Sequence, residues 1–330
     1  MNKNYGTFVI SLDFELFWGV IDNKDIAQYQ DNLAGVHSAV LKILETFEKY
    51  KIHATWATVG FLFFNSKEEL VCSFPDKKPS YIDSSLSPYN FLKLNKLNNQ
   101  DNPIYFAKNL IDKISRNDNQ EIGSHTFSHY YCLEDGQNIE EFRSDILAAK
   151  NAARKLNLNL ESLVFPRNQV NVDYLPVCSE LNINSYRGNQ LSPLYRNSSS
   201  NDSLLKRAFR LVDAYINVSG YNVYNPSNES NKTPLNIRAS SFLRPYSKKI
   251  RYIDYFKLRR IKKAMTHAAE TGKIYHLWWH PHNFGINLEK NIAFLVEILD
   301  HYLYLKGKYH MESLNMNEVR IKYSPVNNKD

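Results

Sequence analysis

The sequence has few cysteines, no long apolar run and no nucleic-acid-reading motif, and each absence argues against a class of protein. Cys72, Cys132 and Cys178 are an odd number, lie far apart and form no CxxC pair, so we expect no disulfide framework. No window approaches the roughly 18 apolar residues that suggest a membrane span. The apolar start is interrupted by Asp13 and Glu15 and lacks a small-residue cleavage site, which is not the pattern of a secretory signal. We therefore expect a soluble cytoplasmic protein.

Positive charge is concentrated in one segment of the chain. The formal net charge is +7, and Arg244–Lys263 (RPYSKKIRYIDYFKLRRIKK) holds nine Lys or Arg against one Asp, a balance of +8. The segment is either a solvated helix face with a basic loop, or a surface for an anionic partner. Such a partner would be a phosphorylated sugar donor, a lipid carrier or a membrane surface. Because no reading motif accompanies the charge, we do not expect nucleic acid.

Short apolar runs rich in β-branched and aromatic residues alternate with amphipathic stretches. The runs that predict strands are 7–12, 53–63 with a turn at Gly60, 120–124, 160–166, 183–188 and the start of 273–285. The stretches that predict helices are 33–50, 102–115, 138–156, 172–182, 254–271 and 288–305. Repeated strand–helix units imply parallel strands with helices outside them.

Two regions break this rhythm. Residues 65–102 and 197–236 are rich in Ser and Asn, and we expect both to be long loops or insertions over a barrel-like core. We expect one domain over residues 1–310 and a C-terminal tail over 311–330.

Two acids stand near the end of the first expected strand. In ISLDFEL, Asp13 and Glu15 are two residues apart, so on a strand both side chains point to the same side. In parallel β/α folds the carboxyl ends of the strands carry the active site. The alternative is a strand that has already left the core, with two solvated acids.

Two histidines follow the expected strand at 120–124. In EIGSHTFSHYYC, His125 and His129 are four residues apart, and a helical turn would place both rings on one side. Two histidines and one carboxylate form the ligand set of an open metal site. Either Asp13 or Glu15 would supply the carboxylate, which leaves the other acid free to act as a base.

An arginine and a late histidine also follow expected strands. In LVFPRNQ, Arg167 is placed to hold a carboxylate with bidentate geometry, although a surface arginine would fit the same pattern. In HLWWHPHNFG, His280 ends a strand, where a histidine suits a general acid. We expect His276 and His282 to be buried structural histidines.

Taken in order, these pieces resemble the polysaccharide deacetylase family, also called the NodB-homology domain or carbohydrate esterase family 4. The first-strand acids, HATWATVGFL, EIGSHTFSH, the arginine after a strand and the late histidine follow the family's order. The resemblance covers residues 5–190 and resumes over 237–305. It implies a distorted (β/α)7 barrel and a divalent metal, usually zinc.

The resemblance also implies a metal-binding role for three residues. His125 and His129 match metal ligands, and Asp13 matches the catalytic base. The family's usual first motif has two adjacent aspartates, and here Phe14 replaces the second. Glu15, one place later, is then the carboxylate ligand.

Two further roles come from the resemblance. His280 matches the late general acid, and Arg167 matches the arginine that orients the base. The family's Asp-Trp motif is not recognisable, and the arginine motif lacks its usual prolines and tyrosine, so this is a divergent branch. Trp278 and Trp279 either stack on a sugar ring or pack in the core.

The implied activity is metal-assisted hydrolysis of a non-peptide carbon–nitrogen bond. The substrate would be a sugar carrying an N-acetyl or similar acyl group, such as a surface-polysaccharide precursor or nucleotide sugar, phosphorylated or lipid-linked. A surface contact with a membrane through Arg244–Lys263 belongs to the same expectation. Two alternatives remain open: a hydrolase of a small cyclic imide or ureide on the same fold, and a non-catalytic carbohydrate-binding relative, which the Phe14 departure permits.

Overall fold

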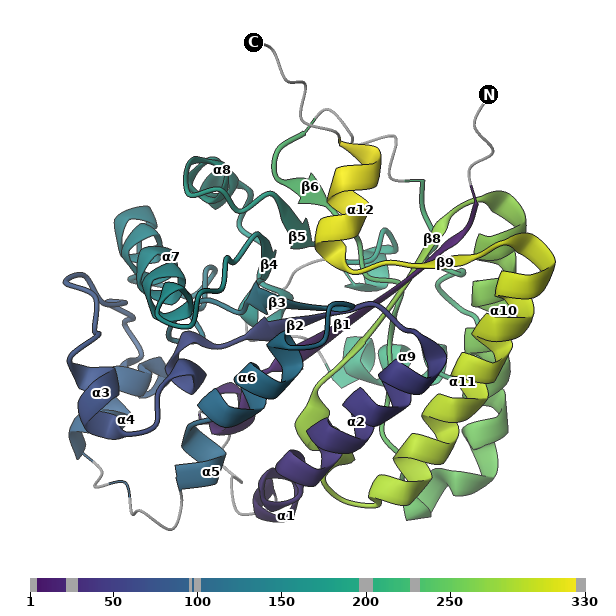
Figure 1. Cartoon of the computed structure of the whole chain (residues 1–330), viewed down its shortest axis with the longest axis horizontal. Helices are drawn as coiled ribbons and strands as arrows, with labels where there is room; N and C mark the ends of the chain where they lie inside the picture. The colour runs from purple at the N-terminus through teal and green to yellow at the C-terminus, as the bar shows by residue number, and fades with distance from the viewer. Residues whose placement is uncertain are drawn as a thin grey trace.

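Parallel strands form one curled sheet through the centre of the molecule (Figure 1). The computed structural model describes residues 5–21, 29–94, 97, 102–195, 204–225 and 232–324. The strands of this part of the chain are β1 (Thr7–Phe14), β2 (Ala54–Thr58), β3 (Gln120–Ser124), β4 (Ser162–Val164), β5 (Ser185–Arg187), β6 (Leu235–Asn236), β7 (Ser241–Phe242), β8 (Ile274–Trp279) and β9 (Glu312–Ser313). Their order is β6-β5-β4-β3-β2-β1-β8-β7, and β9 pairs with β1. The pairings between these strands are parallel.

Helices surround this sheet. They are α1 (Gln30–Ala34), α2 (Val36–Tyr50), α3 (Lys67–Val71), α4 (Pro88–Leu94), α5 (Asn102–Tyr105), α6 (Lys108–Ser115), α7 (Ile139–Arg154), α8 (Leu175–Glu180), α9 (Leu204–Asp213), α10 (Asp254–Thr271), α11 (Leu288–Tyr309) and α12 (Met316–Tyr323). Helices α6, α2, α11 and α10 pack one against the next around the outside (Figure 1). This arrangement confirms the expected α/β fold class. Within the described residues, no helix is long and apolar enough to span a bilayer.

Strand β1 runs through the middle of the sheet. It pairs with β2 on one side and β8 on the other, and all eight of its residues are buried. A parallel strand covered on both faces favours a nearly continuous apolar run, which TFVISL supplies. Because β1 lies between β2 and β8, its last residues lie in the interior of the molecule, at the carboxyl ends of the central strands.

Helix α2 shows how the helices cover the sheet. Val36, Val40, Ile43 and Phe47 recur at helical spacing and are fully buried. The Phe47 ring packs edge-on against the tryptophans of β2 and β8. Burying each such side chain contributes about 1.5–3 kcal/mol, so this helix face anchors the wall of the barrel beside β1.

The two regions expected to be loops contain helices. The first includes α3, whose start is capped by Ser66 accepting a bond from the Glu69 N–H, and α4. The second includes α9, where LLKRAFRLVD is rich in good helix formers. The expectation of long loops is corrected for these helices, and the expectation of insertions stays a prediction. Residues 95–96, 98–101, 197–203 and 226–231 lie outside the described residues. The expected helix at 102–115 is divided into α5 and α6.

The segment after residue 310 also contains regular structure. Strand β9 pairs with the start of β1, and α12 begins with a capping box formed by Asn315 and Glu318. Glu318 also contacts the ring of His53 at 2.8 Å. Residues 311–324 therefore pack against the amino end of the sheet, and residues 325–330 lie outside the described part of the chain.

Candidate active site

The expected site residues stand at the carboxyl ends of neighbouring strands. Asp13 belongs to β1 and Glu15 follows it, His125 follows β3, and His280 follows β8. In register, Asp13 lies beside Ala57 of β2, which lies beside Gly123 of β3. Carboxyl ends of parallel strands meet at one edge, so these side chains converge there.

Phe14 separates the two acids without disturbing them. Its side chain is fully buried, and its ring packs edge-on against Trp56 at 6.0 Å between centroids. Phe14 is therefore a core residue, at the position where the family that the sequence resembles usually has a second aspartate. Glu15, one residue later, brings its carboxylate back to the side of Asp13.

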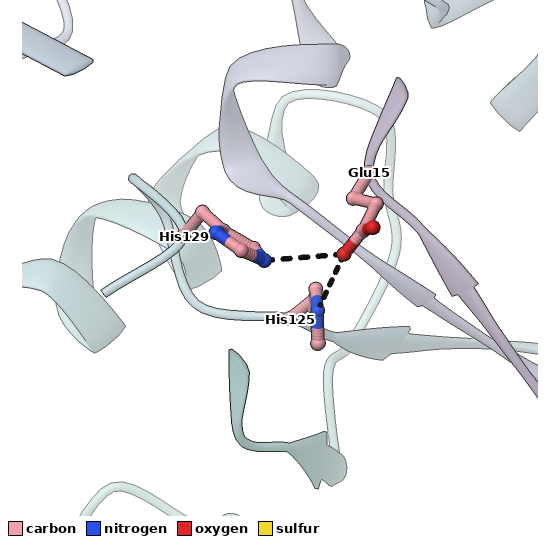
Figure 2. Close-up of side chains that lie close together, drawn as sticks. All are labelled: Glu15, His125 and His129. Atoms are coloured by element: carbon pink, nitrogen blue, oxygen red, sulfur yellow. Dashed lines mark hydrogen bonds and ion pairs between the residues drawn. The ribbon is translucent and has the colours of Figure 1, made fainter. Parts of the chain in front are cut away.

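Glu15, His125 and His129 meet around one carboxylate oxygen (Figure 2). Glu15 Oε2 lies 3.2 Å from His125 Nε2 and 3.1 Å from His129 Nε2. All three side chains are buried, and their ligand atoms lie within 4.8 Å of one another. The expectation that these residues come together is met by the geometry.

The protons on these rings test whether the group fits a cation. His125 Nδ1 lies 2.8 Å from the carbonyl oxygen of Val164, so that nitrogen carries the N–H and donates it. With that N–H on Nδ1, the nitrogen of His125 that can offer a lone pair is Nε2, which faces Glu15 Oε2, and burial lowers the pKa of His129. Lone pairs aimed at a carboxylate oxygen repel unless a positive charge stands among them. A ring N–H bonded to a carbonyl is also the usual support of a metal-ligating histidine, so these residues fit a divalent cation.

The backbone that carries the histidines is not a helical turn, which corrects the sequence-based expectation. Residues 125–130 lie outside the helices, and Thr126 and His129 have φ of 63° and 57°. A left-handed conformation is rare for a β-branched residue such as Thr126 and costs energy. The Thr126 hydroxyl accepts the N–H of Tyr130 at 2.7 Å, which closes the turn.

Asp145 of α7 holds this turn from behind. Its carboxylate accepts the N–H of Phe127 at 2.5 Å, the N–H of Ser128 at 3.2 Å and the Ser128 hydroxyl. Burial raises the pKa of Asp145 to about 7, and the three donors oppose that rise. The strained turn between the two histidines is therefore stabilised by a buried side chain 17 residues beyond it.

Asp13 is held by Arg187, at the end of β5. Arg187 Nη1 donates to Asp13 Oδ1 at 2.6 Å, and Nη2 donates to Oδ2 at 2.7 Å. The same guanidinium donates to Ser11 and Asn168, both at 2.9 Å, and lies 4.2 Å from the Trp278 ring centroid. Burial would raise the pKa of Asp13, but the charge and bonds of Arg187 outweigh it and lower that pKa.

The expectation that Arg167 contacts Asp13 is therefore corrected, because the structure gives that contact to Arg187. Arg167 lies in the turn after β4, 3.6 Å from Glu134 and 4.3 Å from the ring centroid of Tyr131. Arg187 was missed, although it also ends an expected strand, in INSYRG. A charged residue as the last residue of an expected strand, followed by glycine, was the available signal.

His280 lies beside both acids and is the most accessible member of the group. Its Nε2 is 3.4 Å from Glu15 Oε1 and 3.7 Å from Asp13 Oδ2, and 24% of its side chain is exposed. The side-chain amide nitrogen of Asn283 is 3.3 Å from His280 Nδ1. This contact fixes the orientation of the ring, so that Nε2 faces the acids.

The two remaining histidines of this strand differ. His276 is buried between Ser11 and a backbone carbonyl, and burial lowers its pKa to about 3, which confirms a neutral structural role. His282 is nearer the site than expected: its ring stacks on His280 at 5.1 Å, and burial lowers its pKa to about 4. With Glu15 and His280 it forms a second group within ligand distance. Its buried Nδ1 has no hydrogen-bond partner among the described residues, unlike the supported His125.

A cavity of about 280 Å³ opens beside His280 and Trp278. Trp278 lines this cavity, whereas Trp279 is fully buried against Phe47 and Phe284 in the core. Of the two tryptophans, Trp278 is therefore the one placed to meet a bound molecule.

Comparison with known proteins agrees with the fold described above. The polysaccharide deacetylase family model matches residues 22–186, which is half of the chain. A Mycobacterium smegmatis structure assigned to the polysaccharide deacetylases has a TM-score of 0.62 at 10% identity, covering 98% of this chain and 92% of its own. A Pseudomonas aeruginosa PAO1 structure with the same assignment has a TM-score of 0.54 at 12% identity, with coverages of 98% and 92%.

The same fold also serves another reaction. The structure of PuuE allantoinase has a TM-score of 0.53 at 12% identity, covering 98% of this chain and 91% of its own. No curated protein matches the sequence. At these identities the structural likeness shows the fold, the curled parallel barrel, and the family follows from the sequence match. The chain belongs to the polysaccharide deacetylase family.

Proposed function

We propose that this chain is a metal-dependent hydrolase that removes an N-acetyl or similar acyl group from a sugar. The observation that carries the proposal is the shared oxygen of Glu15 facing Nε2 of both His125 and His129, with Asp13 held by Arg187 beside it. Metal ligands, base and acid stand at one edge of the sheet, next to a cavity. Although Phe14 stands between them in the sequence, Asp13 and Glu15 both lie at this site.

Glu15, His125 and His129 are the proposed ligands of a divalent cation, zinc in this proposal. A bound cation would supply Lewis-acid chemistry there, polarising the acyl carbonyl and making a nearby water more acidic. Two histidines and one carboxylate leave positions open for water and substrate.

Asp13 is the proposed base. Arg187 keeps it ionised by lowering its pKa, and each carboxylate oxygen retains a lone pair after accepting one guanidinium N–H. Asp13 takes a proton from the water that attacks the acyl carbon. Arg187 is then a positioning residue, because it acts on the reaction through Asp13.

His280 is the proposed acid. Its Nε2 faces the acids, and its ring lines the cavity, so a proton on Nε2 lies between the base and the place available to a substrate. As the carbon–nitrogen bond breaks, His280 gives this proton to the leaving amine. The products are the free amino sugar and the carboxylic acid. Trp278 offers a ring face for the sugar.

Two measurements on the purified protein test this proposal. We expect about one divalent ion per chain by elemental analysis, and release of acetate from an N-acetylhexosamine that chelation abolishes and added zinc restores. The Asp13→Asn variant should keep the ion and lose most of the activity. A protein without bound metal after growth with zinc, or one that hydrolyses a cyclic ureide but no acylated amino sugar, would overturn the assignment.

A further inference from the structure

The cavity beside His280 is strongly cationic. Its lining side chains include five positive charges and, among the described residues, no aspartate or glutamate. The five are Arg167, Arg210, Arg244, Lys257 and Arg260. Its volume of about 280 Å³ is near the lower end of the range for small-molecule sites. A cavity of this kind favours an anionic group on whatever it binds.

Local ion pairs neutralise only part of this lining. Lys257 Nζ is 3.0 Å from Asp254, Arg260 is 2.8 Å from Asp213 and Arg167 is 3.6 Å from Glu134, so three of the five charges have acidic partners, none of which lines the cavity. Arg244 is half-buried and forms no ion pair within the part of the chain that the structure describes. Arg244 lines the cavity, and no aspartate or glutamate among the described residues lines it with Arg244.

Arg260 has a side-chain N–H group that no described residue accepts. Its side chain is 7% exposed, and its Nε has no hydrogen-bond partner in the described structure. Asp213 is already occupied, since it also accepts bonds from the Tyr195 hydroxyl and the Ser219 N–H, both at 2.7 Å. A buried guanidinium N–H without a partner is costly, so a ligand that accepts it is favoured.

The basic segment at Arg244–Lys263 therefore has two faces. Lys257 and Arg260 are three residues apart on α10, share one helix face and are buried at the cavity. Arg251, in contrast, is exposed and bonds its neighbour Tyr252. The charge concentration seen in the sequence is thus partly an internal feature of a binding site.

The cavity is continuous with the proposed catalytic group. Trp278 and His280 line it. The Arg187 guanidinium, which holds Asp13, lies over the Trp278 ring. We propose that this cavity binds a phosphate group of the substrate, so that the enzyme acts on a phosphorylated acylamino sugar rather than a neutral glycan. This inference rests on the proposed function. Phosphate suits the site because its several oxygens accept the forked N–H groups of arginine in pairs.

Binding is the first test, because it does not require turnover. We would titrate the full-length protein with N-acetylglucosamine and with N-acetylglucosamine 1-phosphate by calorimetry. The phosphate ester should bind at least about 10-fold more tightly, which is about 1.4 kcal/mol, and the advantage should shrink as salt rises. Equal affinities for the two probes, or an advantage that salt does not change, would overturn the inference.

A matched pair of variants locates the effect. Arg244→Gln should weaken binding of the 1-phosphate by about 10-fold, and Arg244→Lys should recover part of it. Arg251→Gln removes the same charge from the same segment, outside the cavity, and should leave the affinity unchanged. Circular dichroism would show that all three variants are folded. If Arg251→Gln weakens binding as much as Arg244→Gln, the cavity is not the site and the inference fails.

Two further probes identify the source of the phosphate. Tighter binding of UDP-N-acetylglucosamine than of the 1-phosphate would support a nucleotide-linked substrate, and tighter binding of a prenyl-phosphate-linked sugar would support a lipid-linked one. If instead Arg244→Gln and Arg251→Gln weaken binding to anionic phospholipid vesicles equally and neither affects the sugar phosphate, the segment is a membrane surface and the inference fails.

The two proposals fail in different ways. Tight, salt-sensitive binding of the 1-phosphate without acyl release would contradict the hydrolase and leave the phosphate site standing. Efficient release of acetate from the neutral sugar, with no gain from the phosphate, would overturn only the inference made here.

Discussion

Replacing Arg187 should uncouple the proposed base from the charge that controls it. Arg187 is 1% exposed and makes four hydrogen bonds, two of them to Asp13. Arg187→Met removes the charge and keeps similar length and apolar volume. Arg187→Lys keeps the charge but cannot reproduce the bidentate fork or the planar contact with Trp278.

The size of the effect follows from burial. Removing one partner of a buried ion pair leaves an uncompensated charge and costs about 3–5 kcal/mol. For a chain of 330 residues we expect Arg187→Met to lower the melting temperature by about 4–7 °C. Arg187→Lys should lie between the methionine variant and the wild type, because one ammonium replaces a fork that made four bonds.

The pH dependence has a definite sign. In the wild type the pKa of Asp13 is lowered, so its ionised form stabilises the fold above the unfolded pKa, and this contribution is lost as pH falls through the folded pKa. Without Arg187 burial prevails and the pKa of Asp13 rises. The acidic limb of kcat/KM should therefore move to higher pH in Arg187→Met, with activity lost first in acid.

Arg167→Met is the matched control. Arg167 lies 3.6 Å from Glu134, with about a third of its side chain exposed, so the loss of stability should be at most about 1 kcal/mol. Because Arg167 also lines the cationic cavity, the comparison uses the neutral N-acetyl sugar, and on that substrate its acidic limb should coincide with that of the wild type. If Arg167→Met moved the limb and Arg187→Met did not, the assignment of Arg187 to Asp13 would be refuted.

Four other substitutions probe the proposed metal site, the turn behind it and the barrel wall. Asp13→Asn should retain bound zinc and lose most activity, whereas Glu15→Gln should lower zinc affinity. Elemental analysis of both variants measures the bound zinc. Loss of zinc in the Asp13 variant with retention in the Glu15 variant would give Asp13 the ligand role instead. Asp145→Asn should cost about 1–3 kcal/mol in urea unfolding, because its NH2 group faces an N–H donor of the turn. The pKa of Asp145 in the fold is about 7, above its ordinary value. The stabilising contribution of this group is therefore complete below about pH 4 and is lost as the pH rises from about 4 to 7. The Asn variant should lack this part of the pH dependence of the unfolding free energy. Phe47→Ala should cost about 3–5 kcal/mol by leaving a cavity, and a change below 1 kcal/mol would contradict the packing described for α2.

The parts of the fold that the sequence predicts well are those with strong local patterns. β1, the helix over Asp254–Thr271 and the helix that starts at Leu288 have long buried runs or sustained helical spacing. Strands β6, β7 and β9 have two residues each, which is too short for any periodicity. They exist because neighbouring strands present unpaired backbone groups to them, which is a property of the folded sheet.

The difference between the two arginines has the same origin. Arg167 and Arg187 both stand at the ends of expected strands, and nothing in the local sequence indicates which guanidinium points at Asp13. Pairing decides it: β5 aligns Arg187 beside Val164 of β4, and the curl of the sheet brings that position opposite β1. Meanwhile Arg167 falls in a left-handed turn, φ 53°, beyond the end of its strand.

The histidines show how a correct prediction can rest on an incorrect local structure. Spacing of four suggested a helical turn, and His125 and His129 do converge, but through a backbone that turns left-handed at Thr126. That conformation is held by Asp145, from a helix that starts well after the motif ends. The arrangement of the two histidine rings is thus a tertiary property supplied from outside the motif. Asp145→Asn should therefore reduce zinc affinity although it removes no ligand, and unchanged zinc affinity in a folded Asn variant would show that the motif holds its own shape.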